Sequence, residues 1–492
     1  MKNVLFIMAD QLRYDALGCT GNTVAVTPHL DDMAKRGVMF QRCYTPNPIC
    51  VPARATVITG NYSHKATGSK NNGGRIRDDQ DKMPELFARA GYRTYAMGKL
   101  HYVPYSAPGE PRLLHGFQTA ELCESGRMLR LHDPEGRLRG VEDYADYLSD
   151  AGWRGFTRAH GLGNNDLHPG VSPLPAEHFV DAWVAERTIA HLTRHAEERN
   201  DQPFFMFMSF PKPHSPYDPP RPYDAMFDPR RVPAAIDRAL LETRSPTVRT
   251  TAWQHGMQYL SPEAVQVMRA HYYGLVSFQD RMIGRVMQYL DRAGLRDDTI
   301  VLYTADHGDL LGDFGGCFKC NWLEGSAHVP FILSAPGQAP AGKASDELVG
   351  LQDILPTLST LTGVPLTRPC DGKDLSGVMQ GNGGVRDVFI GQCLESPSQS
   401  YMAFDGRWKY AYSETNAFEE LYDLQSDPRE LRNLALAGEA RDQSARLRKE
   451  IISWCAANGD AKMLEGGGLK RTDVDIKPRC EFHANSLGWR WY

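Results

Sequence analysis

The sequence has few cysteines, no excess of positive charge and no long apolar run, and each lack excludes a class of protein. Ten cysteines in 492 residues are too sparse for a disulfide-built secreted scaffold, so we expect reduced thiols in the cytoplasm. Lys and Arg number 55 against 60 Asp and Glu, a net charge of −5, which excludes nucleic acid and membrane surfaces as expected partners. No stretch approaches the roughly 18 apolar residues of a membrane span. The opening run Val4–Met8 ends at Asp10 without a cleavage site, so it indicates a strand, not a signal peptide.

What is present indicates a large folded chain rich in loops. Hydrophobic residues make up 41% of the sequence, with 45 Gly and 32 Pro. Short apolar runs alternate with helical patterns, which predicts an α/β fold: a large, mostly parallel sheet covered by helices on both faces. The predicted buried strands are Val4–Met8, Tyr92–Met97, Phe204–Phe210, Thr299–Thr304 and Val329–Ser334. Pro262–Ala293 carries apolar residues at helical spacing and predicts one long core-facing helix.

The pattern changes near residue 375. Short strand-like runs follow closely there, Val388–Cys393, Tyr401–Phe404, Trp408–Tyr412 and Glu420–Asp423, before a helical stretch at Ala440–Ser453. We therefore predict a catalytic domain over residues 1–374 and a C-terminal subdomain over 375–492 with an antiparallel sheet, a helix and an aromatic tail. The tail, Gly488–Tyr492, is apolar enough to pack on a second subunit, so a homo-oligomer is expected. Two long loop segments, 104–166 and 214–233, are expected to cover one end of the large sheet.

Reactive residues follow four of the five predicted strands: Asp10-Gln11, Lys99 with His101, Lys212 with His214, and Asp306-His307. Ligands bind outside the carboxyl ends of parallel strands, so these residues should share one rim of the sheet. Asp10, Gln11, Asp306 and His307 together offer carboxylate, amide and imidazole ligands, which suit Ca²⁺, Mg²⁺ or Mn²⁺. A single Asp after a strand more often caps a loop. Two such residues on one rim, Asp10 and Asp306, favour a metal site instead.

Cys50 precedes what reads as a short helix, with Pro52 at its first position, Arg54 one turn in and Gly60 at its end. The positive end of a helix favours a thiolate or a bound anion. An isolated cysteine is more often a small buried hydrophobe. The position of Cys50 and the spacing to Arg54 favour a reactive residue instead.

These segments resemble the type I sulfatases of the alkaline-phosphatase-like superfamily. Cys50-x-Pro52-x-Arg54 followed by Ala-Thr-x-x-Thr-Gly is similar to the family's signature. Four further segments agree in order: Gly98-Lys99-x-His101, Pro213-His214-x-Pro216, Thr304-x-Asp306-His307-Gly308, and Leu421-Tyr422-Asp423-Leu424 with Asp427-Pro428 and Asn433-Leu434. The likeness spans nearly the whole chain.

The resemblance implies a metal-dependent sulfatase whose nucleophile is formylglycine, made from Cys50 by a formylglycine-generating maturation enzyme. It implies one divalent ion, Ca²⁺ first with Mn²⁺ or Mg²⁺ as alternatives, held by Asp10, Gln11, residue 50, Asp306 and His307. Arg54 and Lys99 would hold the nucleophile and the sulfate, His101 would act on the second hydroxyl of the formylglycine diol, and His214 would protonate the leaving oxygen. Lys319 and Asn72, or its neighbour Asn71, would bind the substrate, a small-molecule sulfate ester.

Two departures leave the substrate class open. Many arylsulfatases carry Asp-Asp at the first metal position and Asp-Asn at the second, whereas this chain has Asp10-Gln11 and Asp306-His307. That pairing resembles the branch of choline sulfatases and phosphonate monoester hydrolases, whose members tend to be cytoplasmic oligomers. A phosphonate monoester or phosphodiester hydrolase is therefore the alternative activity. A non-catalytic binding protein on an inherited fold is the alternative class, and the complete set of reactive residues argues against it.

Overall fold

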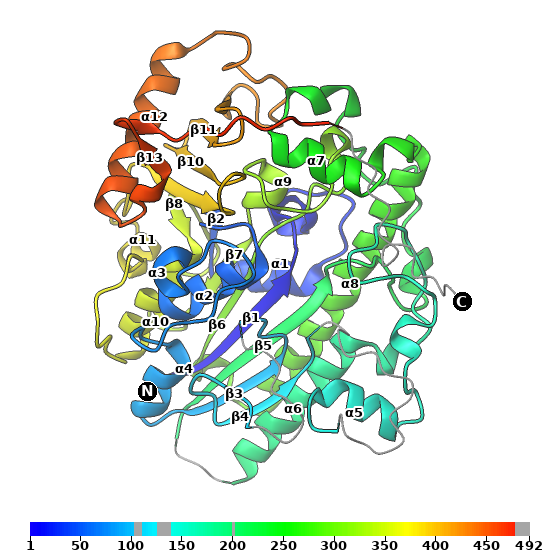
Figure 1. Cartoon of the computed structure of the whole chain (residues 1–492). Coiled ribbons are helices and arrows are strands. Elements are labelled where there is room, and N and C mark those ends of the chain that lie inside the picture. Colours follow the sequence, from blue (N-terminus) through cyan, green and yellow to red (C-terminus); the bar gives the residue numbers. More distant parts are fainter. Residues whose placement is uncertain (103–110, 125–138, 199–201, 478–492) are drawn as a thin grey trace.

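A central eight-stranded sheet organises the part of the chain that this computed structural model describes, residues 1–102, 111–124, 139–198 and 202–477 (Figure 1). In order across the sheet the strands are β4 (Thr119–Leu122), β3 (Arg93–Gly98), β5 (Phe204–Pro213), β1 (Asn3–Asp10), β6 (Thr299–Ala305), β7 (Phe331–Ser334), β2 (Val38–Tyr44) and β8 (Lys343–Gly350). The predicted α/β class is confirmed. Strands β2, β4 and β8 were not predicted: polar residues interrupt their apolar patterns, whereas every residue of β5 and β6 is buried.

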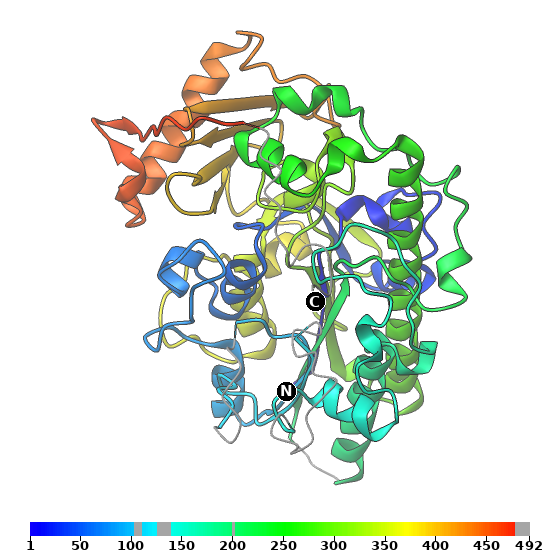
Figure 2. The same ribbon diagram turned by 45° about the vertical axis from the view of Figure 1, so that its right-hand side comes forward.

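Helices cover both faces of this sheet, as expected from its buried strands. Figure 2 shows α8 on one side and the α2 region on the other. The helices are α1 (Pro28–Lys35), α2 (Cys50–Thr59), α3 (Ser63–Ala66), α4 (Met83–Arg89), α5 (Asp143–Asp150), α6 (Val180–Glu197), α7 (Pro246–Gln254), α8 (Pro262–Arg292), α9 (Glu324–Ala327), α10 (Ile354–Thr362), α11 (Ser376–Gln380) and α12 (Arg441–Ala457). The predicted apolar stripe of α8 is buried, from Met268 to Leu290. No helix in the described ranges is both long and apolar enough to cross a bilayer.

The strands that carry the predicted reactive residues lie side by side and run in the same direction. Strand β1 pairs in parallel with β5 and β6, and β5 pairs in parallel with β3. Their carboxyl ends therefore meet at one edge of the sheet, which confirms the predicted shared rim. The chain leaves these strands at Asp10, Gly98, Pro213 and Ala305.

The expectation that Val329–Ser334 forms a parallel strand was wrong. Strand β7 runs antiparallel to both β6 and β2. After β6, residues 306–330 stay at the carboxyl end of the sheet and return into β7 from that same edge, without the crossover that a parallel strand requires. This return keeps Asp306, His307 and Lys319 together above the sheet.

A second sheet lies beyond the first, at the top of Figure 1. Its strands follow an antiparallel meander of β9 (Phe389–Cys393), β10 (Ser400–Phe404), β11 (Trp408–Ser413) and β12 (Phe418–Asp423), which confirms the predicted C-terminal architecture. Helix α12 covers it through Leu447, Ile451 and Cys455. A small two-stranded sheet, β13 (Leu464–Glu465) with β14 (Gly468–Leu469), was not predicted. The aromatic tail lies outside the described residues, as do parts of the 104–166 segment, which contributes β4 and α5.

Candidate functional site

Helix α2 presents Cys50 at the rim of the large sheet. Cys50 is the first residue of the helix, after Ile49 in extended conformation, and all ten residues of the helix are buried. The Cys50 Sγ atom lies 3.1 Å from Nε2 of His307 and 3.9 Å from Oδ1 of Asp10. Burial and the Asp10 charge raise the pKa of this thiol, but nearby positive charge, that of Lys319 above all, outweighs them and lowers the pKa to about 7. Cys50 therefore lies among charged side chains that favour its thiolate form, in contrast to a cysteine packed among apolar groups.

Ligand atoms of Asp10, Cys50, Asp306 and His307 gather in one cluster, all within 4.8 Å of one another. His307 Nε2 is 3.7 Å from Oδ1 of Asp306 and 3.9 Å from Oδ1 of Asp10. Separations of this size fit ligands arranged around a cation at about 2.0 to 2.6 Å. The residues come from β1, α2 and the segment after β6, so the cluster depends on the parallel arrangement of these strands.

The hydrogen bonds around the cluster aim its lone pairs inward. Nδ1 of His307 donates to the carbonyl oxygen of Gly308 at 3.0 Å, which leaves Nε2 as the free acceptor facing the cluster. Oδ1 of Asp306 accepts from the backbone N–H groups of Gln11 and His307 at 3.0 and 2.9 Å. Two oriented carboxylates, an imidazole and the side chain at position 50 fit a divalent cation.

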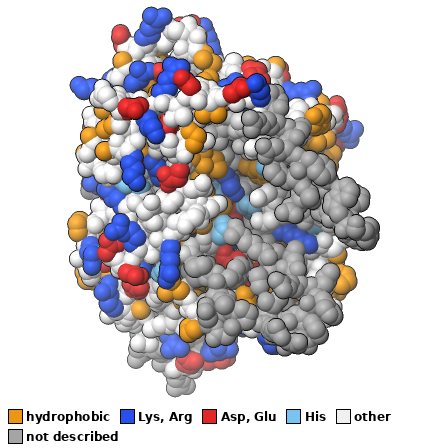
Figure 3. All heavy atoms as spheres, viewed as in Figure 1, with side chains coloured by type: hydrophobic (Ala, Val, Ile, Leu, Met, Phe, Trp, Pro, Cys, Tyr) orange, Lys and Arg blue, Asp and Glu red, His pale blue; other side chains and the backbone are white. Residues whose placement is uncertain are grey.

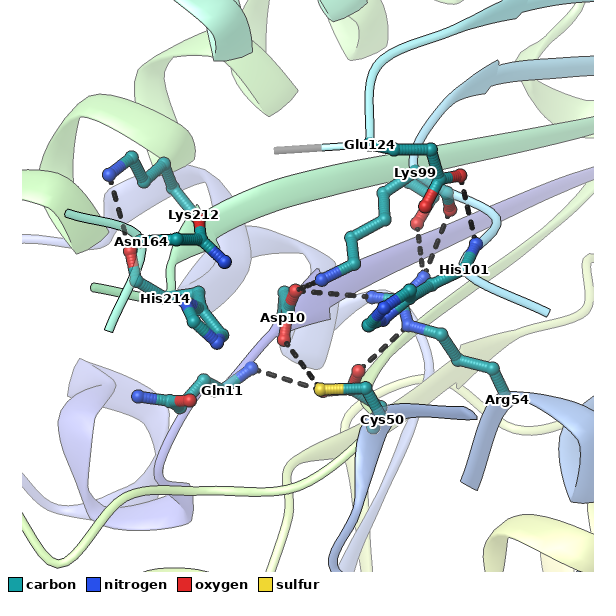
Figure 4. Close-up of polar contacts among 12 residues, drawn as sticks. Asp10, Gln11, Cys50, Arg54, Lys99, His101, Glu124, Asn164, Lys212 and His214 are labelled. Carbon is teal, nitrogen blue, oxygen red and sulfur yellow. Dashed lines mark hydrogen bonds and ion pairs between the residues drawn. The ribbon is translucent and has the colours of Figure 1, made fainter. Parts of the chain in front are cut away.

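Arg54 and Lys99 bring positive charge to the acidic cluster, and Figure 4 shows both side chains directed at Asp10. Arg54 is fully buried: its Nε donates to Oδ2 of Asp306 at 2.8 Å, and its Nη1 donates to Lys99 O and Ser209 Oγ. Its Nη2 has no hydrogen-bond partner among the described residues and lies 3.9 Å from Oδ2 of Asp10. Lys99 Nζ contacts that same oxygen. An unpartnered guanidinium N–H beside a second cation is the arrangement expected at an anion-binding site.

Lys319, Gln11 and His214 form the opposite wall. Lys319 Nζ donates to Oε1 of Gln11 at 2.6 Å and lies 3.0 Å from Nε2 of His214. Nδ1 of His214 lies 2.8 Å from the carbonyl oxygen of Ser215, so this nitrogen carries the proton. Burial and the Lys319 charge hold the pKa of His214 well below its usual value. The Gln11 amide oxygen already accepts from Lys319, so it would have to share its second lone pair with a metal ion.

His101 and Asn72 lie at the edges of this group. His101 is buried two residues after Lys99, with a left-handed backbone φ of 58°. Asn72 is exposed, and its Oδ1 accepts from the backbone N–H of Val51 at 3.2 Å, beside the start of α2. On the face shown in Figure 3, His side chains are visible in a hollow near the middle of the molecule, with Lys or Arg beside them. All the predicted site residues thus lie around one rim.

Sequence reasoning placed Asp309 on this rim without giving it a role, and it missed Glu124. Oδ2 of Asp309 accepts from Gln11 Nε2 at 2.6 Å and from the hydroxyl of Tyr217 at 2.5 Å, which turns the Gln11 amide oxygen toward Lys319. Glu124 lies behind Lys99 and His101. Asp309 could have been given a role because only Gly308 separates it from the predicted metal pair. Glu124 carried no signal, because it falls in the irregular 104–166 segment.

Comparison with known proteins agrees with this geometry. Residues 2–364 match the Sulfatase family, and residues 312–456 match the C-terminal region of N-sulphoglucosamine sulphohydrolase. An arylsulfatase of Clostridium perfringens is 31% identical over 466 residues, covering 92% of this chain and 93% of the relative. A choline-sulfatase of Rhizobium meliloti is 30% identical over 452 residues, covering 88% and 82%.

Solved structures share the same fold. The phosphonate monoester hydrolase of Agrobacterium radiobacter superposes with a TM-score of 0.79 at 25% identity, covering 96% of this chain and 100% of that one. The family match extends over far more than half of the chain and includes each predicted metal and catalytic residue. On this match and on the identity to the arylsulfatase over nearly its whole length, the chain belongs to the sulfatase family.

Proposed function

We propose that this protein hydrolyses sulfate esters of small molecules, with formylglycine made from Cys50 as its nucleophile. The observation that carries the proposal is the position of Cys50: it begins a buried helix, it contacts His307 and Asp10, and the charges of Lys319 and Lys99 act on it. An aldehyde-derived nucleophile and a sulfate group both need that combination of a cation site and positive charge. We assign the activity to a catalytic domain over residues 1–374 and treat 375–492 as its C-terminal subdomain.

Asp10, Gln11, Asp306 and His307 would hold one divalent ion together with residue 50. Such an ion, when bound, lowers the pKa of a nearby hydroxyl and polarises sulfate oxygens. Carboxylate and amide oxygens suit Ca²⁺ first and Mg²⁺ as an alternative, and the imidazole keeps Mn²⁺ as another. Elemental analysis of the purified protein by inductively coupled plasma mass spectrometry identifies the bound ion.

Formylglycine at position 50 would supply a hydrated aldehyde, so that one hydroxyl attacks sulfur and the other later expels sulfate. Arg54, Lys99 and Lys319 would bind the sulfate oxygens, where negative charge gathers in the transition state. His214 would pass a proton to the leaving alcohol oxygen through Nε2: Nδ1 keeps its own proton on Ser215 O, and Lys319 Nζ, 3.0 Å from Nε2, would supply the proton that is transferred. His101 would take the proton of the second hydroxyl, and Asn72 would contact the substrate beside the start of α2.

The decisive experiment is co-expression with a formylglycine-generating enzyme, followed by intact-mass analysis and an aryl sulfate assay. We expect an aldehyde mass at Cys50 and multiple turnovers. Cys50→Ser keeps one hydroxyl but lacks the second, so it should release at most one equivalent of alcohol. Cys43→Ala, which changes a buried cysteine in β2, is the matched control and should keep activity. Multiple turnovers by Cys50→Ser would contradict the mechanism.

A phosphonate monoester or phosphodiester hydrolase is the second candidate. It is favoured by the Gln11 and His307 pair and by the similarity to the Agrobacterium radiobacter enzyme. The ratio of kcat/KM for an aryl sulfate and for the matching aryl phosphonate monoester separates the two, because specificity is a difference in transition-state binding. A cytoplasmic location, the maturation enzyme as a partner and a homo-oligomer stay predictions.

A further inference from the structure

The segment that carries Lys99 and His101 makes a tight turn directly after β3. Gly98 ends the strand with a φ of 98°, and a Cβ atom there would lie 2.0 Å from the carbonyl oxygen of Ser209. The N–H of Lys99 donates to that same oxygen at 2.9 Å. Two residues later, His101 has a φ of 58°, a conformation that a side chain with a Cβ seldom adopts. The turn therefore needs support from outside itself.

Glu124 provides that support. Its Oε1 accepts from the backbone N–H groups of both Leu100 and His101, each at 2.9 Å (Figure 4). The Glu124 side chain is buried, so water does not replace these bonds. Loss of the acceptor would leave two buried N–H groups without a partner, which destabilises the turn.

The position of Glu124 is set by the sheet. It follows β4, which pairs in parallel with β3 so that Leu122 lies opposite Gly98. The N–H of Cys123 donates to Gly98 O at 3.0 Å, and the N–H of Glu124 donates to Oε1 of Glu142 at 2.9 Å. These two bonds fix the backbone at Glu124, from which its side chain reaches the turn. Burial raises the pKa of Glu124 and the Lys99 charge opposes this, but either protonation state keeps an oxygen that can accept.

We propose that Glu124 is a positioning residue: by binding the N–H groups of Leu100 and His101, it holds the Lys99 and His101 side chains in register with residue 50. This rests on the proposed function, because it gives Lys99 and His101 their part in ester hydrolysis. Misplacement of such groups by about 1 Å can cost on the order of 100-fold in rate.

The experiment compares Glu124→Met, which removes the acceptor without leaving a cavity, with Glu124→Gln, which keeps an acceptor oxygen. We expect kcat for an aryl sulfate to fall about 10- to 100-fold in Glu124→Met with KM within about threefold. Glu124→Gln should stay within about threefold of wild type in both. The aldehyde content of residue 50 should be equal in all three proteins.

Asp280→Leu is the matched control. Asp280 in α8 is also buried and also accepts from two consecutive backbone N–H groups, those of His29 and Leu30, but it supports α1 instead of the catalytic turn. It should lower thermal stability while leaving kcat unchanged. An unchanged kcat in Glu124→Met, an equal loss in Glu124→Gln, or an equal loss in Asp280→Leu would each overturn the proposal. If Glu124→Met does not fold, Glu124→Asp replaces it, and wild-type kcat in that shortened variant would overturn the proposal.

Amide hydrogen exchange separates this inference from the proposed function. The amides of Leu100 and His101 should exchange faster in Glu124→Met than in wild type and Glu124→Gln, whatever the substrate. Slow exchange in Glu124→Met contradicts the role of Glu124 alone. A wild-type protein that carries the aldehyde but shows no turnover would contradict the proposed function, and with it the catalytic role given to Glu124. If the amides still exchange as expected, the role of Glu124 in holding the turn would stand.

Discussion

Nε2 of His307 faces Sγ of Cys50 at 3.1 Å, because Nδ1 of the same ring is engaged by the carbonyl oxygen of Gly308. One backbone oxygen thus decides which nitrogen of His307 is available to the acidic cluster. This ring orientation is the usual way in which proteins prepare a histidine to bind a metal ion. The orientation of the His307 ring, which Gly308 sets, therefore affects what residue 50 can contact.

Replacing His307 should therefore weaken metal binding. In His307→Ala we expect the affinity for the divalent ion to fall at least tenfold, because the cluster loses its imidazole ligand. Turnover should fall with it. Metal content after dialysis and titration with Ca²⁺ and Mn²⁺ measure this. His195→Ala changes a buried histidine in α6 and should keep the metal. Full metal occupancy in His307→Ala would contradict the assignment of His307.

Arg54 should contribute to stability as well as to catalysis. In Arg54→Met the buried carboxylate of Asp306 loses its ion-pair partner, and removing one member of a buried pair costs about 3 to 5 kcal/mol. Denaturant unfolding in EDTA should show this loss, and added metal should reduce it by neutralising Asp306. A variant as stable as wild type in EDTA would show that Asp306 does not depend on Arg54.

Asp181 should make stability depend on pH. Burial raises its pKa from 3.8 to about 7, and Oδ1 has no hydrogen-bond partner among the described residues. Because the folded state holds this proton more tightly than the unfolded state, the stabilisation is complete below about pH 4 and is lost as pH rises through 7. The free energy of unfolding of Asp181→Asn should therefore fall less between pH 5 and pH 8 than that of wild type.

The same unfolding series checks the sign of that effect. Asp298→Asn, which changes a side chain that is 76% exposed, is the control and should follow wild type. Equal slopes for wild type and Asp181→Asn would contradict the raised pKa.

Lys70 connects the turn that carries Asn72 to the C-terminal subdomain. Its buried Nζ lies 3.1 Å from both carboxylate oxygens of Asp460 and donates to Gln399 and Tyr401. Asp460→Asn should lower stability by about 3 kcal/mol and raise KM for the aryl sulfate more than it lowers kcat, because the substrate-contacting turn loosens. Asp405→Asn, in the same subdomain and away from this turn, should leave KM unchanged. Wild-type KM in Asp460→Asn would show that the turn holds without the subdomain.

The reactive residues could be predicted from sequence because each follows a recognisable local pattern. Asp10 and Asp306 each directly follow a continuous apolar run, and Cys50 and Arg54 fall in a short motif that ends at Gly60. Parallel strands bring their carboxyl ends together whatever lies between them, so the shared rim followed from the strand pattern alone. The direction of β7 did not follow, because it depends on where residues 306–330 return to the sheet.

By itself, the sequence determined the residue types of the site, the α/β class and the resemblance to sulfatases, because apolar periodicity and short motifs act over a few neighbouring residues. The tertiary structure decided which atoms face one another: Asp309 behind Gln11, Glu124 beneath Lys99 and His101, and Lys70 against Asp460. These contacts join residues far apart in the chain. A buried polar group must find whichever partner the fold brings within about 3 Å, and only the packed molecule decides which partner that is.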